Sequence, residues 1–259
     1  MSVAILINGE KQENLIQRSI NSCLRQTYEK AQIILVYNNL KNEKLLKKKY
    51  KDNIFFIKIN KKIKNPIQDQ LYKIKKSLPY IKKDHIFLLD GDDYFLKTKV
   101  ANVLKIINNK TMLVQDNYYQ LEKNKKKLAK QQNYKEFKIY KCLVNNWPRR
   151  ISTSCQAMPT GVLRKFFKNN NPFEWKHLAI DAQLAIFCKH KFKVKNLDEA
   201  YTIKNIINNG LDKKYQKVFN KYFWLRRMEQ HYLNDRYKKK SFKGLDFLLC
   251  SLINLFIKK

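Results

Sequence analysis

The sequence lacks the features that mark several classes of protein. No pair of cysteines has the close spacing of a zinc or redox site, and their number is odd. The five are Cys23, Cys142, Cys155, Cys188 and Cys250. We expect them to be reduced, small core residues of a cytoplasmic protein. No internal repeat is present, and the apolar segment at residues 3–7 is too short for an export signal.

Acidic residues and arginine are also scarce. Lys and Arg together number 55 against 21 Asp and Glu, which gives a net charge of +34, and nearly all the basic residues are Lys. Because Arg is the preferred reader of bases and phosphates, lysines spread along the chain favour a solvated surface over specific nucleic-acid binding. We expect non-specific attraction to an anionic membrane surface. A basic nucleic-acid-binding protein is the alternative.

What the sequence does contain is a regular alternation of strands and helices. Its 259 residues, 44% of them apolar, are enough for one large domain with an appendage. The alternation predicts an α/β fold, with a parallel sheet and helices on both faces. We expect a hairpin or loop at residues 122–130. The predicted strands cover residues 3–7, 33–36, 54–59, 86–89, 111–115 and 192–197, and the helices 12–26, 42–50, 67–78 and 100–107.

One predicted strand, at residues 86–89, leads directly into three carboxylates. These are Asp90, Asp92 and Asp93, with Gly91 between the first two. Strand ends in open α/β sheets bind ligands, and carboxylates this close repel one another unless a cation lies between them. Hard divalent cations such as Mn²⁺ or Mg²⁺ take oxygen ligands and bridge to diphosphates. The alternative is a polar turn that ends a core strand.

Two motifs in this order resemble the inverting family 2 glycosyltransferases, which have the GT-A fold: a Rossmann-like, mostly parallel sheet flanked by helices. Residues 20–28 read Ile-Asn-Ser-Cys-Leu-Arg-Gln-Thr-Tyr and precede the strand at residues 33–36, as at the end of that family's first helix. Residues 87–93, Phe-Leu-Leu-Asp-Gly-Asp-Asp, are similar to its Asp-x-Asp motif. The resemblance covers about residues 1–205, which we take as the glycosyltransferase domain, and is weakest at residues 112–147.

The resemblance implies a nucleotide-sugar donor and a divalent cofactor, Mn²⁺ or Mg²⁺. Asp90 and Asp92 would hold the ion, with Asp93 supporting them. The chain departs from the family at the nucleotide, because Tyr37-Asn38-Asn39 replaces the usual pair of Asp residues. The identity of the nucleotide base is therefore left open. A relative that keeps the fold and has lost catalysis is a second alternative to an active enzyme. The nucleotide-sugar residues that the resemblance suggests are Asn8, Asn38, Asn39, Asp69, Asp90 and Gly91.

The resemblance also implies a catalytic base, which takes the proton from the acceptor hydroxyl. In the family this is the Asp of a Glu-Asp pair at the start of a helix. Here Ile180 replaces the Glu and Asp181 remains. The alternative is that Asp181 only caps the helix, in which case Asp116 is the next candidate. Trp147, Trp175 and His177 are weaker candidates for contact with the acceptor.

The last part of the chain, residues 206–259, is predicted to be a helical extension. Apolar residues at helical spacing predict one long helix over residues 212–233. The apolar run at 245–257 is too short and interrupted to span a bilayer. The Lys residues on both sides of that run favour an interfacial helix on an anionic leaflet, but a helix packed on the domain or on a second copy is an equal alternative.

Further features concern the acceptor. Several spanning helices and a Gln-x-x-Arg-Trp motif would accompany processive polysaccharide synthases, and the sequence has neither. We therefore expect transfer of a single sugar. By analogy with the family, the acceptor would be a glycan or a lipid-linked molecule, and the reaction would belong to lipopolysaccharide or surface polysaccharide biosynthesis. The protein would then be cytoplasmic and peripheral at the inner face of the cytoplasmic membrane.

Overall fold

The computed structural model of the chain describes residues 2–9, 13–107, 111–123, 125–129, 152–206, 215, 220–238 and 244–257. The first half alternates strands and helices, as the sequence predicts. In chain order the elements are β1 (Val3–Gly9), α1 (Glu13–Leu24), β2 (Ala31–Tyr37), α2 (Glu43–Tyr50), β3 (Ile54–Lys58), α3 (Pro66–Ser77), the short 3-10 helix η1 (Leu78–Tyr80) and β4 (His85–Asp90). Strand β1 lies between β2 and β4, and these pairs, like β2 and β3, are parallel.

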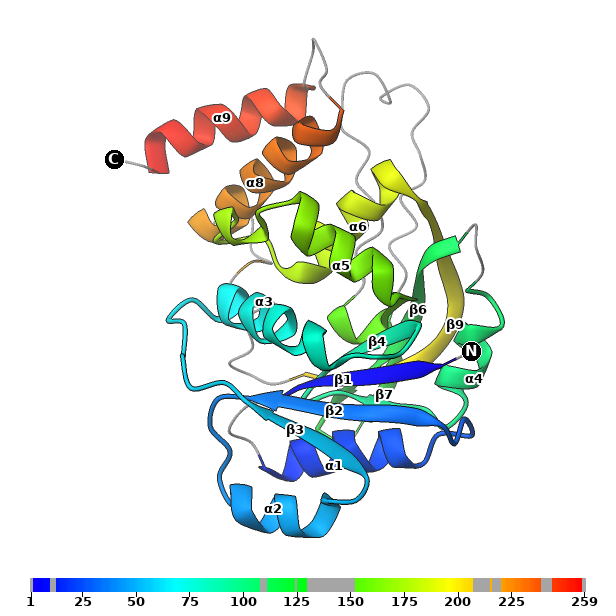
Figure 1. Ribbon diagram of the computed structural model, residues 1–259. Helices are drawn as coiled ribbons and strands as arrows, with labels where there is room; N and C mark the ends of the chain where they lie inside the picture. The colour runs from blue at the N-terminus through cyan, green and yellow to red at the C-terminus, as the bar shows by residue number, and fades with distance from the viewer. Residues whose placement is uncertain are drawn as a thin grey trace.

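Both faces of this parallel sheet are covered, because alternate residues of each strand point to opposite sides. Val3, Ile5 and Ile7 pack with α1, α2 and α4 (Lys99–Leu104) on one face. Ala4 and Leu6 pack with α3, α5 (Thr160–Asn169) and α6 (Ile180–Lys191) on the other. Figure 1 shows α1 and α2 below the sheet and α3, α5 and α6 above it. The strands therefore need apolar residues throughout, which explains their continuous runs.

The second half of the sheet is mixed rather than parallel. It contains β5 (Tyr94–Phe95), β6 (Thr111–Glu122), β7 (Lys125–Leu128), β8 (Gln156–Pro159) and β9 (Lys193–Asn205). The strand order is β3-β2-β1-β4-β8-β6-β9-β5, and β7 pairs with β6. β8 is antiparallel to β4 and β6, whereas β9 is parallel to β6. The hairpin expected at residues 122–130 is confirmed as β6 and β7, and β6 is longer than the strand predicted there.

Two helices follow β9: α8 (Lys221–Tyr237) and α9 (Leu245–Ile257). The prediction of one continuous helix over residues 212–233 is wrong at Asn220. That residue has extended backbone angles, and its side-chain oxygen accepts a hydrogen bond from the Tyr222 N–H at 3.0 Å. Asn is a preferred N-cap because it satisfies such an N–H, and α8 therefore begins at Lys221. Short 3-10 helices also occur at Thr153–Cys155 (η3) and Pro172–Glu174 (η4).

The helical extension packs on the domain through α6. Trp175, Leu178, Ala182 and Ile186 form an apolar cluster with Leu233 of α8. Among the described residues, no helix is both long enough and apolar enough to cross a membrane. The four described cysteines are buried and free, as expected, and Cys142 lies outside the described residues.

Candidate active site

The candidate site lies where β1 and β4 end side by side. Asn8 of β1 is paired with Asp90 of β4, and the Gly91 N–H donates to the Asn8 carbonyl oxygen at 2.9 Å. A Cβ atom on Gly91 would lie 2.9 Å from that oxygen and 3.1 Å from the Gly9 Cα. Only glycine allows the two backbones to come this close. The chain therefore turns immediately after β4 and holds the next two carboxylates at the sheet edge.

Asp90 is held from two directions. Its Oδ1 accepts a hydrogen bond from the Gln70 side-chain amide of α3 at 2.6 Å, and its N–H donates to the Ser154 hydroxyl at 3.0 Å. Burial, and then the charges of Asp93 and Asp92, raise the pKa of Asp90 well above its usual range. The Asp90 carboxylate is therefore costly to ionise unless positive charge is brought to it.

Asp93 is fixed more firmly, and both of its carboxylate oxygens are used. The Ser154 hydroxyl donates to Oδ2 at 2.6 Å, and the Asn205 N–H donates to Oδ1 at 3.0 Å. Burial, followed by the charge of Asp92, raises the pKa of Asp93 to about 7. Asp93 is nearly inaccessible to solvent. Asp93 therefore holds the turn in place from inside the domain.

Asp92 is only partly buried. Its carbonyl oxygen accepts a hydrogen bond from Arg18 of α1 at 3.0 Å, and the Arg18 guanidinium lies 4.4 Å from the centre of the Tyr94 ring. The backbone on either side of Asp92 is thus anchored. Within the described ranges, no three His, Cys, Asp or Glu side chains could hold a metal ion by themselves. Asp90 and Asp92 could supply hard oxygen ligands to a divalent ion, with the remaining ligands coming from a diphosphate and water.

Asp181 lies in the first turn of α6 and is not its N-cap, which is Ala179. Its carboxylate accepts from the Ala182 N–H at 2.7 Å, and its carbonyl oxygen accepts from the Gln156 side chain at 2.9 Å. The charge of Asp181 is among those that raise the pKa of Asp90. Gln156 follows Ser154 by two residues, and the Ser154 hydroxyl contacts both Asp90 and Asp93. One short segment therefore contacts both the β4 turn and the start of α6.

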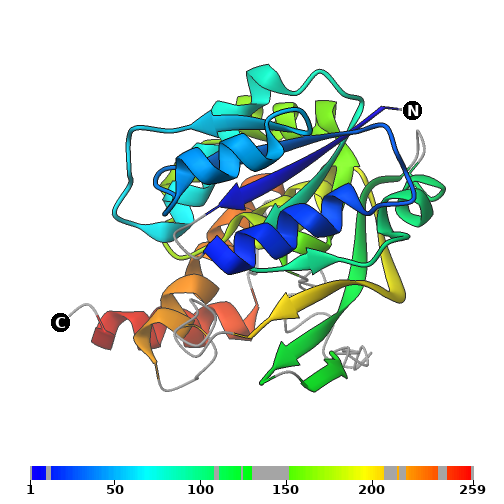
Figure 2. The ribbon, with the colours of Figure 1, turned by 90° about the horizontal axis from the view of Figure 1, so that it is seen from below.

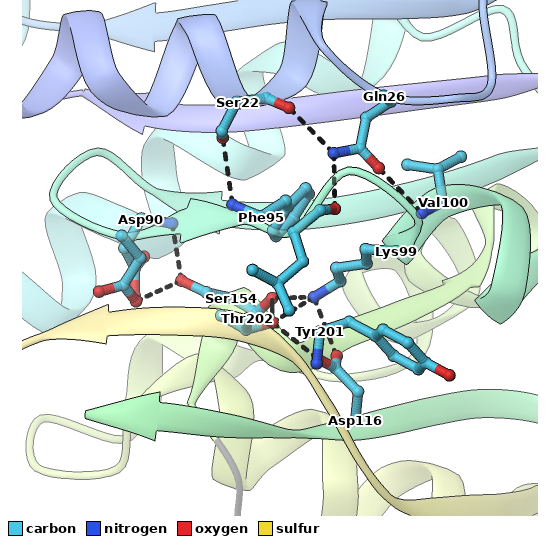
Figure 3. A network of polar contacts seen from close by, with 12 residues as sticks. Ser22, Gln26, Asp90, Phe95, Lys99, Val100, Asp116, Ser154, Tyr201 and Thr202 are labelled. Carbon is cyan, nitrogen blue, oxygen red and sulfur yellow. Dashed lines mark hydrogen bonds and ion pairs between the residues drawn. The ribbon is translucent and has the colours of Figure 1, made fainter. Parts of the chain in front are cut away.

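A buried ion pair lies beneath the site (Figure 3). The Lys99 ammonium is 2.9 Å from Asp116 Oδ1 and donates to the Ser154 carbonyl oxygen at 2.5 Å and the Thr202 hydroxyl at 2.6 Å. Thr202 in turn donates to Asp116. Ser154 therefore connects this pair to both Asp90 and Asp93. Asp116, the second candidate for the base, is occupied by structural contacts inside the domain.

The predicted nucleotide residues lie at or near the same sheet edge. The Asn8 side-chain oxygen is buried without a hydrogen-bond partner among the described residues, so it can accept from a ligand. Asn38 donates to the carbonyl oxygens of Ile59 and Lys61 at 3.1 and 2.9 Å. It therefore holds the loop after β3 and retains its side-chain oxygen as an acceptor. Asn39 is exposed next to it.

Asp69 lies in the first turn of the Lys-rich helix α3. It is buried and forms an ion pair with the equally buried Lys73 at 2.8 Å. Its other oxygen accepts from the Ile63 N–H at 3.0 Å. These contacts hold the loop between β3 and α3 and give Asp69 a structural role. They leave its predicted contact with the nucleotide without support.

The predicted acceptor residues pack against the extension instead. Only 8% of Trp175 is exposed, and the Arg236 guanidinium lies 5.1 Å from the centre of its ring. The His177 ring contacts Tyr215 and Tyr222, and the backbone N–H of His177 donates to the Glu229 carboxylate at 2.8 Å. Little of the Trp175 ring is accessible to a sugar, so its burial argues against the acceptor role. Trp147 lies outside the described residues.

Sequence reasoning missed three residues of the site: Gln70, Ser154 and Lys204. The positive charge of Lys204 lowers the pKa of both Asp90 and Asp93. In β9, Lys204 lies two residues beyond Thr202, on the same face of the strand. Side chains alternate between the two faces of a strand, and this pattern is the one sequence signal that could have distinguished Lys204 from the other lysines.

The chain was also compared with known proteins. Residues 2–170 match the profile of the family described as glycosyl transferase family 2. The match includes Asn8 and residues 90–93 but ends before Asp181. No curated protein sequence shows significant similarity to the chain.

Among solved structures, TarS 1–349 of S. aureus in complex with UDP-GlcNAc superposes with a TM-score of 0.65 at 11% identity, over 98% of this chain and 73% of that one. The mannosyltransferase PcManGT from Pyrobaculum calidifontis, in complex with GDP-Man and Mn²⁺, gives 0.65 at 10% identity, over 96% and 68%. A longer TarS gives 0.63 at 12% identity, and this chain spans only 41% of it. These neighbours share the fold. Since the profile match covers well over half of its 259 residues, the chain belongs to glycosyl transferase family 2 and is a glycosyltransferase with the GT-A fold.

Proposed function

We propose that the protein transfers one sugar from a nucleotide-sugar donor to an acceptor hydroxyl, with inversion at the anomeric carbon and with a divalent metal ion. The observation that carries the proposal is a pair of contacts made by one short segment of chain. The Ser154 hydroxyl contacts Asp90 and Asp93, and the Gln156 side chain, two residues on, contacts the Asp181 carbonyl oxygen. Two carboxylate sites are what this reaction needs, one beside the departing diphosphate and one beside the acceptor.

Asp181 is the proposed catalytic base. Its carboxylate takes the proton of the acceptor hydroxyl while that oxygen attacks the anomeric carbon from the face opposite the diphosphate. The bond between the anomeric carbon and the β-phosphate oxygen breaks in the same displacement, which inverts the configuration. The Ala182 N–H, which donates to the Asp181 carboxylate at 2.7 Å, orients that side chain.

Asp90 and Asp92 are the proposed contacts to Mn²⁺ or Mg²⁺, and Asp93 holds their turn in place. The ion supplies charge stabilisation for the departing nucleoside diphosphate. The donor set fits this role, since it consists of hard carboxylate oxygens at a strand end. Lys204 adds a fixed positive charge next to the same carboxylates.

Asn8, Asn38 and Asn39 are proposed to contact the nucleotide. TarS was crystallised with UDP-GlcNAc and PcManGT with GDP-Man, so neighbours of this fold accept different bases. An amide has both donor and acceptor groups and can pair with the edge of uracil or guanine. We propose that the donor is a UDP-sugar or a GDP-sugar.

The proposed acceptor is a glycan or glycolipid of lipopolysaccharide or surface polysaccharide biosynthesis. The net charge of +34 favours an anionic membrane surface as a partner. We accordingly place the protein at the inner face of the cytoplasmic membrane. Residues 1–205 would form the catalytic domain, and residues 206–259 an extension attached to it.

A thermal-shift panel of UDP, GDP and their sugars, with and without Mn²⁺, tests the donor and the metal together. At a ligand concentration of a hundred times Kd, binding should raise Tm by about 5–11 °C. The donor found in this way is then used in transfer assays, with the anomeric configuration of the product read by NMR. Nucleotide binding without transfer to any acceptor would favour a relative that has lost catalysis. Tight, sequence-selective DNA binding at physiological salt would favour the nucleic-acid alternative.

A further inference from the structure

Helix α9 exposes a continuous apolar stripe. Its most exposed side chains recur at steps of three and four residues, so they share one face of the helix. Phe256 is 80% exposed. Single exposed apolar side chains are ordinary, but a row of them on one helix marks a surface that is covered by something else. The stripe consists of Leu245, Leu248, Leu249, Leu252, Leu255 and Phe256.

The opposite face of α9, which packs on α8, carries the polar residues of the helix together with Phe247, whose ring contacts His231 and Tyr232. Asp246 Oδ2 lies 3.4 Å from His231 Nε2, and the Asn254 side chain donates to the Trp224 carbonyl oxygen at 3.4 Å. Asn254 and Cys250 are both buried. A surface helix of a globular domain has the reverse arrangement, with apolar residues inward and polar residues outward. Packing on the domain therefore does not bury the apolar side of α9.

Charge distinguishes the candidate partners for this stripe. A second copy of the chain would bring another formal charge of +34 against the first, and like charges oppose association. In the sequence, Lys238, Lys239, Lys240 and Lys243 precede the helix, and Lys258 and Lys259 follow it. Such lysines are attracted to anionic lipid headgroups.

The length of α9 determines how it would meet a bilayer. Thirteen residues at 1.5 Å each extend roughly 20 Å, which is less than the ~30 Å hydrocarbon core. A helix of this kind lies in the plane of the interface, with its apolar side in the boundary between headgroups and acyl chains. In Figures 1 and 2, α9 lies towards the side of the sheet where β1 ends, which is also the side of the candidate site.

We propose that α9 binds the surface of an anionic bilayer through the stripe from Leu245 to Phe256. The inference rests on the membrane partner of the proposed function and assigns the surface that meets it. The polar side of α9 holds the helix on α8 while the stripe enters the lipid. The candidate site would then face a lipid-linked acceptor at the membrane.

The test uses the full chain without nucleotide and measures co-sedimentation with vesicles of phosphatidylglycerol and phosphatidylcholine. We expect binding that weakens with added salt and is much weaker on pure phosphatidylcholine. The variant Leu252→Gln/Phe256→Gln should lower the partition coefficient by about tenfold for each side chain withdrawn from lipid. The matched control is Leu45→Gln/Phe55→Gln, which removes one exposed Leu and one exposed Phe from α2 and β3. The control should bind like the wild type.

Three outcomes would overturn the inference. One is equal binding by the α9 variant and the wild type, and another is equal binding to anionic and neutral vesicles. The third is a dimer in light scattering that the α9 variant dissolves, because the stripe would then belong to a second copy. Melting temperatures show whether each variant is folded. Donor binding in solution is measured separately, so failure of the membrane inference and failure of the proposed sugar transfer can be told apart.

Discussion

Lys99 offers the sharpest test of how the candidate site is supported. Its side chain is fully buried, and its ammonium contacts Asp116, Thr202 and the Ser154 carbonyl oxygen (Figure 3). Substituting Met keeps much of the volume of the side chain and removes the charge and the hydrogen bonds. Asp116 would then be a buried carboxylate without its cation.

The expected cost follows from these contacts. Removing one partner of a buried ion pair costs about 3–5 kcal/mol, because the remaining charge stays in a poorly solvated environment. For a chain of this size each kcal/mol lowers Tm by about 2–4 °C, so Lys99→Met should lower it by roughly 6–20 °C. Replacing both charges by apolar residues, Lys99→Met/Asp116→Leu, should recover much of this loss.

The pH dependence has a defined sign. Burial raises the pKa of Asp116, and the Lys99 charge is the largest influence that lowers it. Without Lys99 this pKa rises further above its unfolded value of about 3.9. The folded state then binds a proton that the unfolded chain does not, so the variant gains stability as the pH falls. Its deficit against the wild type should therefore shrink between pH 8 and pH 5.

Urea unfolding followed by circular dichroism at several pH values measures these effects. Lys105→Met is the matched control, because Lys105 is exposed at the end of the same helix. It should change the free energy of unfolding by less than about 0.5 kcal/mol. A loss below about 1 kcal/mol for Lys99→Met, with no recovery in the double variant, would refute the buried-pair reasoning.

Further predictions concern the site and the extension. Asp181→Asn should lower turnover by about a hundred- to ten-thousandfold with near-normal donor affinity and Tm; retained transfer would disprove the base role. Asp92→Asn should abolish Mn²⁺-dependent nucleotide binding in thermal-shift assays and leave the fold intact, whereas the exposed control Asp52→Asn should bind normally. Lys204→Gln should weaken nucleoside diphosphate binding about tenfold in titration calorimetry, and unchanged affinity would count against its placement. Burial raises the pKa of Glu229 to about 7, so this carboxyl should lower the stability as the pH rises from about 4.5 to 7. Glu229→Gln should therefore make the pH dependence of stability less steep over that range in urea unfolding, and an unchanged slope would contradict the burial argument.

Much of the first half of the fold follows from local patterns. Strands β1 to β4 and helices α1 to α3 match the predicted elements within a few residues, because each buries a continuous or periodic apolar set. The prediction for residues 212–233 failed because helical spacing alone does not reveal that Asn220 is extended and caps α8. The capping role of Asn220 depends on its own backbone angles, which the spacing of apolar residues does not report.

The position of the three carboxylates after β4 is readable from the sequence, since a buried strand determines where its polar end lies. The contacts that surround these carboxylates cannot be read from the sequence. Ser154 and Asn205 hold Asp93 across more than sixty residues of chain, and nothing in the neighbourhood of Asp69 or Trp175 in the sequence reveals that both are buried. Contacts between distant segments form only when the sheet brings them together.

By itself, the sequence determined the α/β class, the resemblance to family 2 and the acidic turn, because these depend on residues close together in the chain. The tertiary structure decided that the neighbouring residues Ser154 and Gln156 contact Asp90 and Asp181, and that Lys99 is a buried partner of Asp116 rather than one more surface lysine. It also decided that the apolar stripe of α9 faces outward. The physical reason is the same in each case: burial and charge pairing depend on which distant segments pack together, and local periodicity does not specify that packing.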